Sequence, residues 1–393
     1  MKIAIDGTPI VHGSRAVCRH SKNLLKTMMS LYSDHEYKLF YLDRKRRNQR
    51  YIKLPDGRSV REYIISVPGR ILQPGWKYLT LPKAEWFIGN FDIFYATGMF
   101  FPPSASGIVL GTVHGLAYYT IEEKLVQKEA ASLKKGLAFT LKHADYLLAV
   151  SDQTRKELFQ FLNVPEERVY VVNHGLDPHF RILNDRTSLY RRLEKRFGIT
   201  EPYILFVGVI GYHKNILGLL KSYEILRNHG VKLPLILAGP PGSAWKEVQN
   251  WIKEKGWGNC LFTVGLIDQN NGELRDLYNG ASLFVFPSFY EGWTAPPLEA
   301  MACGTPVITS NCSSIPETVG EAAIMVDPNN PEELAYKIIK VFNDELLKNS
   351  LINKGLTHVK LHTWEKAATK MNDVFIDIQS RGPWRGKRNE DSN

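Results

Sequence analysis

The stretch that decides the fold of this chain is Phe286-Pro-Ser-Phe-Tyr-Glu-Gly-Trp-Thr-Ala-Pro-Pro-Leu-Glu-Ala-Met-Ala-Cys-Gly-Thr-Pro-Val-Ile308. It begins at the end of an apolar run, 281–286, which predicts a buried strand that Pro287 ends. After a loop, a helix is expected near Ala295, because the prolines that follow cost least in a helix's first turn. A glycine and a proline then end the helix, and 305–308 leads into a second strand at 307–309. The stretch therefore predicts the order strand, loop, short helix, strand.

Two carboxylates frame the loop and the helix start. Glu291 lies in the loop and Glu299 about one turn into the helix, with the backbone N–H groups of Thr294 and Ala295 between them. Backbone N–H groups at a helix start attract anions. Two acids on either side of a phosphate cradle suit a ligand that is hydroxylated at both ends and charged in the middle. A nucleotide sugar has that shape.

This pair of acids resembles the E-x7-E motif of the family-4 retaining glycosyltransferases, which have the GT-B fold. A bare pair of glutamates is a weak signal, and two solvated glutamates at helix ends are the ordinary alternative. Here the resemblance extends over a long frame, residues 287–288, 291–292, 296–308 and 313–317. The chain departs from the family at Thr294, where Gly is usual, and at Ala295, where Leu or Ile is frequent. Both residues belong to the expected donor cradle, together with Ser288.

Length, cysteine spacing and hydropathy limit the classes of protein to which this chain can belong. A chain of 393 residues predicts two or three domains, and 44% hydrophobic residues suffice for large cores. The four cysteines have no metal-site or disulfide spacing, which favours a reducing compartment. The first six residues read as a strand rather than a signal peptide, and no apolar run approaches the length of a membrane span. A cytoplasmic protein is therefore expected.

The net charge of +10 is placed unevenly. Residues 1–182 hold 26 Lys+Arg against 17 Asp+Glu, a net charge of +9, and the densest basic run is 44–50. Such a surface would attract anionic lipid head groups or a pyrophosphate acceptor. For the run 44–50 itself, an ordinary solvated loop without a binding role is an equally good interpretation. The segment 71–88 mixes aromatic residues with lysines, so it either rests on a membrane surface or packs as an ordinary amphipathic helix. If these segments bind lipid, the cytoplasmic protein would lie peripherally at the inner face of the cell membrane. Nucleic acid is not an expected partner, because no recognition motif accompanies the charge.

Strands and helices alternate along both halves of the chain, which predicts parallel, doubly wound sheets. With the resemblance, the expected architecture is GT-B, two Rossmann-like domains facing a central cleft. The expected division is an acceptor-binding domain at 1–182, a nucleotide-sugar-binding domain at 183–363, a helix at 364–380 that crosses back to the first domain, and a disordered tail at 381–393.

In the first half, the resemblance points to a loop and to a strand end. The loop after the first strand, 7–14, is glycine-rich in the family and approaches donor phosphate and acceptor. Here the family's glycines are lost, so Gly13, Arg15 and Arg19 are the candidates for this role, with plain surface charge as the alternative for the arginines. His114 follows an apolar strand at 107–113, where the family carries a histidine, and the resemblance implies that it contacts the transferred sugar.

In the second half, the resemblance places donor contacts on three further loops. The family usually has Pro-Arg-Lys-Asn where this chain has Tyr-His-Lys-Asn at 212–215, so Lys214 and Asn215 are expected near the diphosphate. A lysine serves there as a point charge, and a solvated lysine at a helix start is the alternative. Gly265, Leu266 and Ile267 should place backbone groups near the nucleobase. Glu299 is expected to bind the ribose hydroxyls and Glu291 the hydroxyls of the donor sugar.

The implied reaction is transfer of a hexose with retention, from a nucleotide diphosphate sugar to a glycan or lipid-linked saccharide. GDP-mannose is the first expectation for the donor and a UDP-sugar the second. The sequence contains no Asp-x-Asp metal anchor and marks no covalent nucleophile, so a metal-free, front-face displacement is expected. A nucleotide-sugar 2-epimerase of the same architecture and a non-catalytic sugar-nucleotide-binding protein remain alternatives. A dinucleotide oxidoreductase is disfavoured, because the first strand lacks a following Gly-x-Gly-x-x-Gly.

Overall fold

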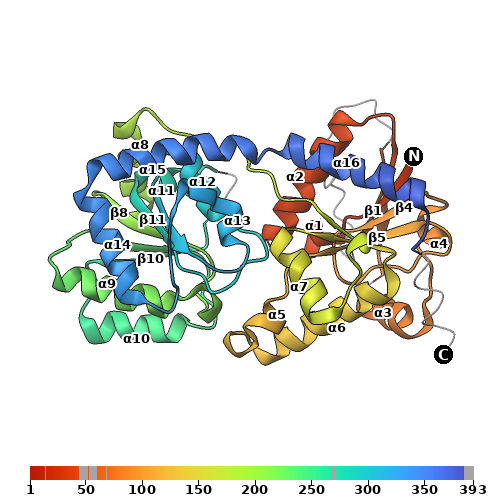
Figure 1. The fold of residues 1–393 in the computed structure, drawn as a ribbon, viewed down its shortest axis with the longest axis horizontal. Coiled ribbons are helices and arrows are strands. Elements are labelled where there is room, and N and C mark those ends of the chain that lie inside the picture. Colours follow the sequence, from red (N-terminus) through yellow and green to blue (C-terminus); the bar gives the residue numbers. More distant parts are fainter. Residues whose placement is uncertain (14, 44–51, 53–59, 68, 268–270, 385–393) are drawn as a thin grey trace. The chain divides into compact units, whose positions relative to one another are not determined.

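The computed structural model describes residues 1–13, 15–43, 52, 60–67, 69–267 and 271–384 (Figure 1). The chain forms two compact units. Unit 1 comprises residues 1–118, 128–175 and 363–393, and unit 2 comprises 119–127 and 176–362. The division differs from the expected one at 182/183, because Leu176 N–H already donates to the carbonyl of His362 in unit 2 (2.9 Å). The basic run at 44–50 lies outside the described residues.

Unit 1 is built on a parallel sheet of seven strands in the order β3-β2-β1-β4-β5-β6-β7. The strands are β1 (Lys2–Asp6), β2 (Glu36–Leu42), β3 (Val60–Ile65), β4 (Ile93–Ala96), β5 (Ile108–Val113), β6 (Tyr146–Ala149) and β7 (Val169–Val171). Its helices are α1 (Thr8–His12), α2 (Arg15–Leu31), α3 (Gly69–Pro74), the π-helical turn η1 (Gly75–Leu79), α4 (Glu85–Ile88), α5 (Ala117–Thr120), α6 (Gln127–His143), α7 (Asp152–Leu162) and α16 (Trp364–Arg381).

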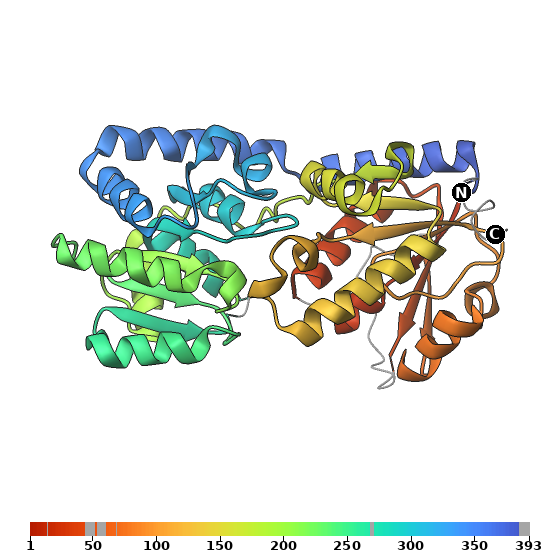
Figure 2. The ribbon, with the colours of Figure 1, turned by 60° about the horizontal axis from the view of Figure 1, so that its bottom comes forward.

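Unit 2 carries a parallel sheet of six strands in the order β10-β9-β8-β11-β12-β13, with helices on both faces (Figure 2). The strands are β8 (Tyr203–Val207), β9 (Leu235–Ala238), β10 (Leu261–Gly265), β11 (Ala281–Phe286), β12 (Val307–Ser310) and β13 (Ile324–Val326). The helices are α8 (Arg186–Phe197), α9 (Ile216–Asn228), α10 (Trp245–Lys255), α11 (Glu273–Gly280), α12 (Pro296–Ala302), α13 (Ile315–Val319), α14 (Pro331–Asn343) and α15 (Glu345–His358). The predicted pair of doubly wound parallel sheets is confirmed.

Apolar runs predicted these strands except β3, because strands covered on both faces need apolar side chains at every position, whereas β3 is largely half-buried and carries Arg61 and Glu62. In β11, for example, the side chains of Leu283 to Phe286 are all buried. In each sheet, the strand order reverses once along the chain, between β1 and β4 in unit 1 and between β8 and β11 in unit 2. Parallel strands end at the same sheet edge, and ligands of open α/β sheets bind outside the strand ends at such a reversal.

The last helix, α16, belongs to unit 1. It packs on α2. Two hydrogen bonds link it to the segment that follows α2, one from Tyr32 Oη to Thr369 Oγ1 (3.2 Å) and one between His35 Nε2 and Asn372 Oδ1 (2.9 Å). Past the middle of the helix, Phe375 is fully buried. Arg381, where the tail was expected to begin, is the last residue of α16 and pairs with Asp377 (2.8 Å). Residues 385–393 lie outside the described part of the chain.

Two segments of unit 1 differ from their predicted form. The loop expected after β1 contains the short helix α1, because Pro9 lies in the first turn, where its fixed φ favours a helix start. The segment 71–88 is not one amphipathic helix. Pro74 lacks an N–H for the helical ladder, and the chain widens into η1 before a separate α4. None of the helices in the described part of the chain combines the length and apolarity that crossing a membrane requires.

Candidate active site

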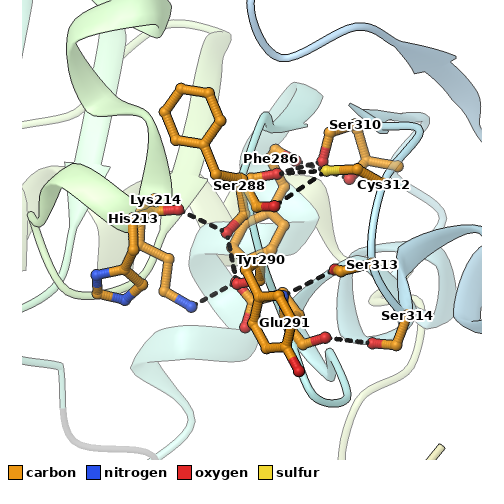
Figure 3. Close-up of polar contacts among 12 residues, drawn as sticks. His213, Lys214, Phe286, Ser288, Tyr290, Glu291, Ser310, Cys312, Ser313 and Ser314 are labelled. Carbon is orange, nitrogen blue, oxygen red and sulfur yellow. Dashed lines mark hydrogen bonds and ion pairs between the residues drawn. The ribbon is translucent and has the colours of Figure 1, made fainter. Parts of the chain in front are cut away.

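The loop that follows β11 carries the first acid of the predicted pair (Figure 3). Ser288, fully buried at the strand end, donates from Oγ to Glu291 Oε1 (2.7 Å). Lys214, from the loop after β8, donates to the same oxygen at 2.5 Å. Because β8 and β11 are neighbours in the sheet, the loops after them meet at one edge. The structure thus joins three predicted donor residues, Lys214, Ser288 and Glu291, at the strand reversal of unit 2.

The Lys214–Glu291 ion pair is largely removed from water, with side-chain exposures of 15% and 12%. From the sequence, each of these two residues was expected on the donor, and their pairing with one another was not predicted. A lysine held against a carboxylate can exchange that partner for a diphosphate, and the carboxylate then becomes available to hydroxyl groups. The pair is therefore suited to a ligand that brings both an anion and hydroxyls.

Two neighbouring loops fix the backbone of Glu291. Its N–H donates to Ser313 Oγ (2.9 Å), and its carbonyl accepts from Ser314 Oγ (2.8 Å) (Figure 3). The carbonyl of His213 accepts from Phe289 N–H (2.9 Å), which ties the 212–215 loop to the same turn. Ser313 and Ser314 belong to the 313–317 segment of the family frame, so that segment holds the backbone of Glu291 in place.

His213, which stands where the family usually has an arginine, does not add a positive charge. Burial, and then the neighbouring Lys214, lower the pKa of His213 to about 4. Its ring is therefore neutral at physiological pH, and Lys214 is the cation of this loop. Asn215 has a left-handed backbone (φ 55°), and its side chain donates to the Pro328 carbonyl (2.6 Å). Asn215 thus stabilises the conformation of the 212–215 loop.

The second acid, Glu299, lies in α12 and is 1% exposed. It accepts a hydrogen bond from Tyr278 Oη, in α11, at Oε2 (2.8 Å). Tyr278 was missed by the sequence analysis, because a tyrosine near the end of an amphipathic helix gives no signal of a functional role. Glu299 is held in one orientation by this contact. Thr294 is also buried, at 1% exposure, and Ala295 directly precedes α12.

The predicted nucleobase segment lies at the end of β10. Gly265 has a left-handed backbone (φ 67°), which turns the chain away from the strand. Leu266 is 50% exposed and Ile267 is buried. β10 is separated from β8 by β9 alone in the parallel sheet, so these residues and Lys214 both follow strands at the same end of the sheet.

In unit 1, His114 follows β5 and its Nε2 lies 3.0 Å from the carbonyl oxygen of Thr97. A carbonyl only accepts, so Nε2 carries the proton of the neutral ring and Nδ1 keeps a lone pair. Burial lowers the pKa of His114, which favours this neutral form. His114 can therefore accept a hydrogen bond from a hydroxyl group at Nδ1.

A buried acid that the sequence analysis missed lies at the strand reversal of unit 1. Asp6 ends β1, and its carbonyl accepts from Thr97 Oγ1 (2.6 Å). Burial raises the pKa of Asp6 to about 6. The signal in the sequence was a charged residue at the end of an apolar strand. A carboxyl group with a perturbed pKa at such a place is a candidate for function.

Of the three residues predicted for the acceptor or phosphate side, Gly13 lies in the turn between α1 and α2, and Arg15 and Arg19 lie in α2. Gly13 ends α1, and a Cβ there would lie 2.4 Å from the Pro9 carbonyl oxygen, so the turn requires glycine. Arg15 begins α2, and its side chain lies outside the described atoms. Arg19 lies one turn later and acts electrostatically on His174, whose pKa is lowered well below its usual value, first by burial.

Comparison with known families matches both halves of the chain. The model of the family described as "Glycosyltransferase Family 4" matches residues 17–180, and that described as "Glycosyl transferases group 1" matches 191–358. Together the two models span most of both units.

Individual relatives extend the match to whole chains. The "O-antigen chain mannosyltransferase B" of Escherichia coli is 29% identical over 391 residues, 95% of this chain and 99% of the relative. Among solved structures, a sucrose-phosphate synthase from Thermosynechococcus elongatus superimposes with a TM-score of 0.71 at 18% identity, over 97% of this chain and 100% of that one. Anabaena HepE in complex with UDP-glucose also gives 0.71, at 15% identity, over 96% and 100%. The chain is therefore a glycosyltransferase of the GT-B fold, made of a family-4 domain and a group-1 domain.

Proposed function

We propose that this glycosyltransferase moves a mannosyl residue with retention from GDP-mannose to a glycan or lipid-linked saccharide, at the inner face of the cell membrane. The mannosyl choice is supported by the Escherichia coli relative, whose name is that of an O-antigen mannosyltransferase. A UDP-sugar is the second candidate for the donor, supported by HepE, which was solved with UDP-glucose.

One observation carries the proposal, the convergence of Lys214, Ser288 and Glu291 at the strand reversal of unit 2. In the proposed complex, Lys214 moves from Glu291 to the diphosphate and neutralises charge that grows as the leaving group departs. Glu291 then accepts hydrogen bonds from the donor sugar, and Glu299, oriented by Tyr278, accepts those of the ribose. His114 receives a hydroxyl of the transferred sugar at Nδ1.

The proposed chemical step is a front-face displacement. The bond from the anomeric carbon to the phosphate oxygen breaks as the acceptor oxygen bonds to the same face, and the acceptor's proton passes to the departing phosphate. Such a step depends on stabilising the leaving group rather than on a strong base. Because Lys214 supplies the positive charge, we propose that no metal ion is required.

The test is a donor panel assayed for product with a lipid-linked oligosaccharide acceptor, with and without excess EDTA. We expect mannosyl transfer from GDP-mannose, an α-linkage in the product by NMR, and unchanged activity in EDTA. Transfer only from a UDP-sugar would replace the donor, and activity lost in EDTA and restored by Mn²⁺ would refute the metal-free step. An epimerised nucleotide sugar without any transfer product would refute the proposal as a whole.

A further inference from the structure

Asp6 is a buried carboxylate that the proposed mechanism does not use. It ends β1 and is 2% exposed. Its Oδ1 accepts a hydrogen bond from the N–H of Thr8, the first residue of α1 (2.9 Å). Burial raises the pKa of Asp6 to about 6, and what opposes burial is hydrogen bonding to Thr8 rather than a counter-ion. The side chain is therefore ionised at physiological pH, in a place where a charge is costly.

A role in the turn before α1 alone would not need this charge. An asparagine could accept the same N–H through its side-chain carbonyl and would bury no charge. An ionised carboxylate has about four acceptor positions. Thr8 can fill two of them, one from its N–H and one from its hydroxyl. Asp6 thus keeps the capacity to accept hydrogen bonds from a ligand.

The second carboxylate oxygen of Asp6 lies beside Gly98, in the loop after β4. A Cβ on Gly98 would lie 3.9 Å from Asp6 Oδ2 and 3.0 Å from Pro9 Cγ. Gly98 itself is partly exposed. Any other residue at 98 would therefore fill the position next to this oxygen, which glycine leaves to a small group from outside.

Asp6 and His114 are both tied to Thr97. Thr97 Oγ1 donates to the Asp6 carbonyl (2.6 Å), and the Thr97 carbonyl accepts from His114 Nε2 (3.0 Å). Asp6 ends β1, Thr97 follows β4 and His114 follows β5, and these three strands are adjacent in the sheet. A ligand group at the Asp6 carboxylate and another at His114 Nδ1 would therefore be close neighbours at the strand reversal of unit 1.

We infer that Asp6 accepts a hydrogen bond from a hydroxyl group of the acceptor saccharide, and that Gly98 keeps the space for it. The inference rests on the proposed function, in which His114 receives the transferred sugar, because the acceptor must meet that sugar. A carboxylate repels a diphosphate, so this position suits the uncharged hydroxyls of a saccharide. Asp6 binds and orients the hydroxyl here, and the acceptor's proton still passes to the departing phosphate.

The experiment compares sugar transfer with donor hydrolysis, in which water takes the place of the acceptor. Full-length proteins are assayed with GDP-mannose, or the donor that the panel selects, with and without increasing lipid-linked oligosaccharide. We expect Asp6→Asn to hydrolyse the donor as the wild type does. Its kcat/KM for the oligosaccharide should fall by about 10- to 100-fold, the usual loss for a hydrogen bond to a charged group. Gly98→Ala should raise the acceptor KM and also spare hydrolysis, because its Cβ occupies the position beside Oδ2.

Asp145→Asn is the matched control. Asp145 directly precedes β6, at the opposite end of the same sheet, and its buried carboxylate accepts from Val109 N–H at the same distance, 2.9 Å. This variant should keep both transfer and hydrolysis. Thermal melting verifies folding, and Gly98→Ala, which retains the carboxylate, decides the case if Asp6→Asn does not fold.

The outcomes separate this inference from the proposed function. Wild-type acceptor kinetics in Asp6→Asn, or an equal loss of transfer and hydrolysis, would overturn the inference and leave the proposed function intact. A wild type that hydrolyses or epimerises nucleotide sugars without transferring any sugar would overturn both.

Discussion

At the scale of single residues, Glu291 and Glu299 occupy different surroundings and should fail differently when replaced. Glu299 is predicted to bind ribose, which does not react, so Glu299→Ala should mainly raise the donor KM, and Tyr278→Phe should do so more mildly. Glu291 is predicted to act where charge develops, so Glu291→Ala should lower kcat by about 10²–10³. Initial-rate kinetics on folded variants measures both. A Glu291→Gln variant with wild-type kcat would show that the charge of Glu291 is not needed.

The Lys214–Glu291 pair should also appear in stability. Removing one partner leaves a largely buried charge without its counter-ion, so Lys214→Met and Glu291→Gln should each destabilise unit 2 by about 1–3 kcal/mol, somewhat less than for a fully buried pair. The double variant should lose less than the sum, by about 1–2 kcal/mol of coupling. Denaturant unfolding of the four proteins measures this cycle. Strict additivity would mean that the contact contributes nothing.

These residue contacts show where prediction from the sequence ended. The acids and Lys214 were identified because the family frame fixes their place along the chain. Their pairing was not, because 77 positions separate Lys214 from Glu291, and only the sheet order places the ends of β8 and β11 together. Tyr278 and Asp6 depend on the same tertiary information.

At the scale of elements, the Lys214 loop is positioned by a close approach of two backbones. A Cβ on Gly239, which follows β9, would lie 1.8 Å from the Gly208 carbonyl oxygen after β8. Gly239→Ala should therefore separate the two strand ends, destabilise unit 2 by about 2–4 kcal/mol and weaken donor binding. Thermal melting and calorimetry with GDP measure the two effects.

Gly258→Ala is the matched control, because nothing lies within 4 Å of a Cβ there. It should change stability by less than about 1 kcal/mol. Equal effects of the two substitutions would contradict the role given to the close approach.

Among the elements, strands were predicted best, because a strand that is buried on both faces has an apolar side chain at every position. The π-helical turn was not, because Pro74 disfavours a regular α-helix without specifying what replaces it, and α1 was not, because five residues are too few to show a helical period.

At the scale of the whole molecule, acid should act on unit 1 through buried histidines. His20 stacks on His174 with ring centroids 3.7 Å apart, and burial lowers the pKa of His20 to about 3, with His114 adding to the effect. An unfolded histidine takes up a proton near pH 6.5. Stability from His20 is therefore complete above about pH 6.5 and falls toward pH 3, by up to about 1.4 kcal/mol per pH unit.

The variant His20→Phe keeps a stacking ring and removes the titrating group. Its unfolding free energy, measured by denaturant between pH 7.5 and 4.5, should fall less steeply than that of the wild type by about one proton's worth. Asp6 acts in the opposite direction, because its raised pKa favours the folded state at low pH, and it is present in both proteins. Parallel curves for the two proteins would rule out His20 as the acid-sensitive group.

The assignment of α16 to unit 1 has a consequence for synthesis on the ribosome. Unit 2 is complete once His362 has emerged, whereas unit 1 still lacks α16, the helix that packs on α2. At about 5–20 residues per second, α16 follows the end of β7 by about 10–40 seconds. The first half of the protein to be translated is thus the second to finish folding, because the face of α2 that α16 covers stays open until the end of the chain has been made.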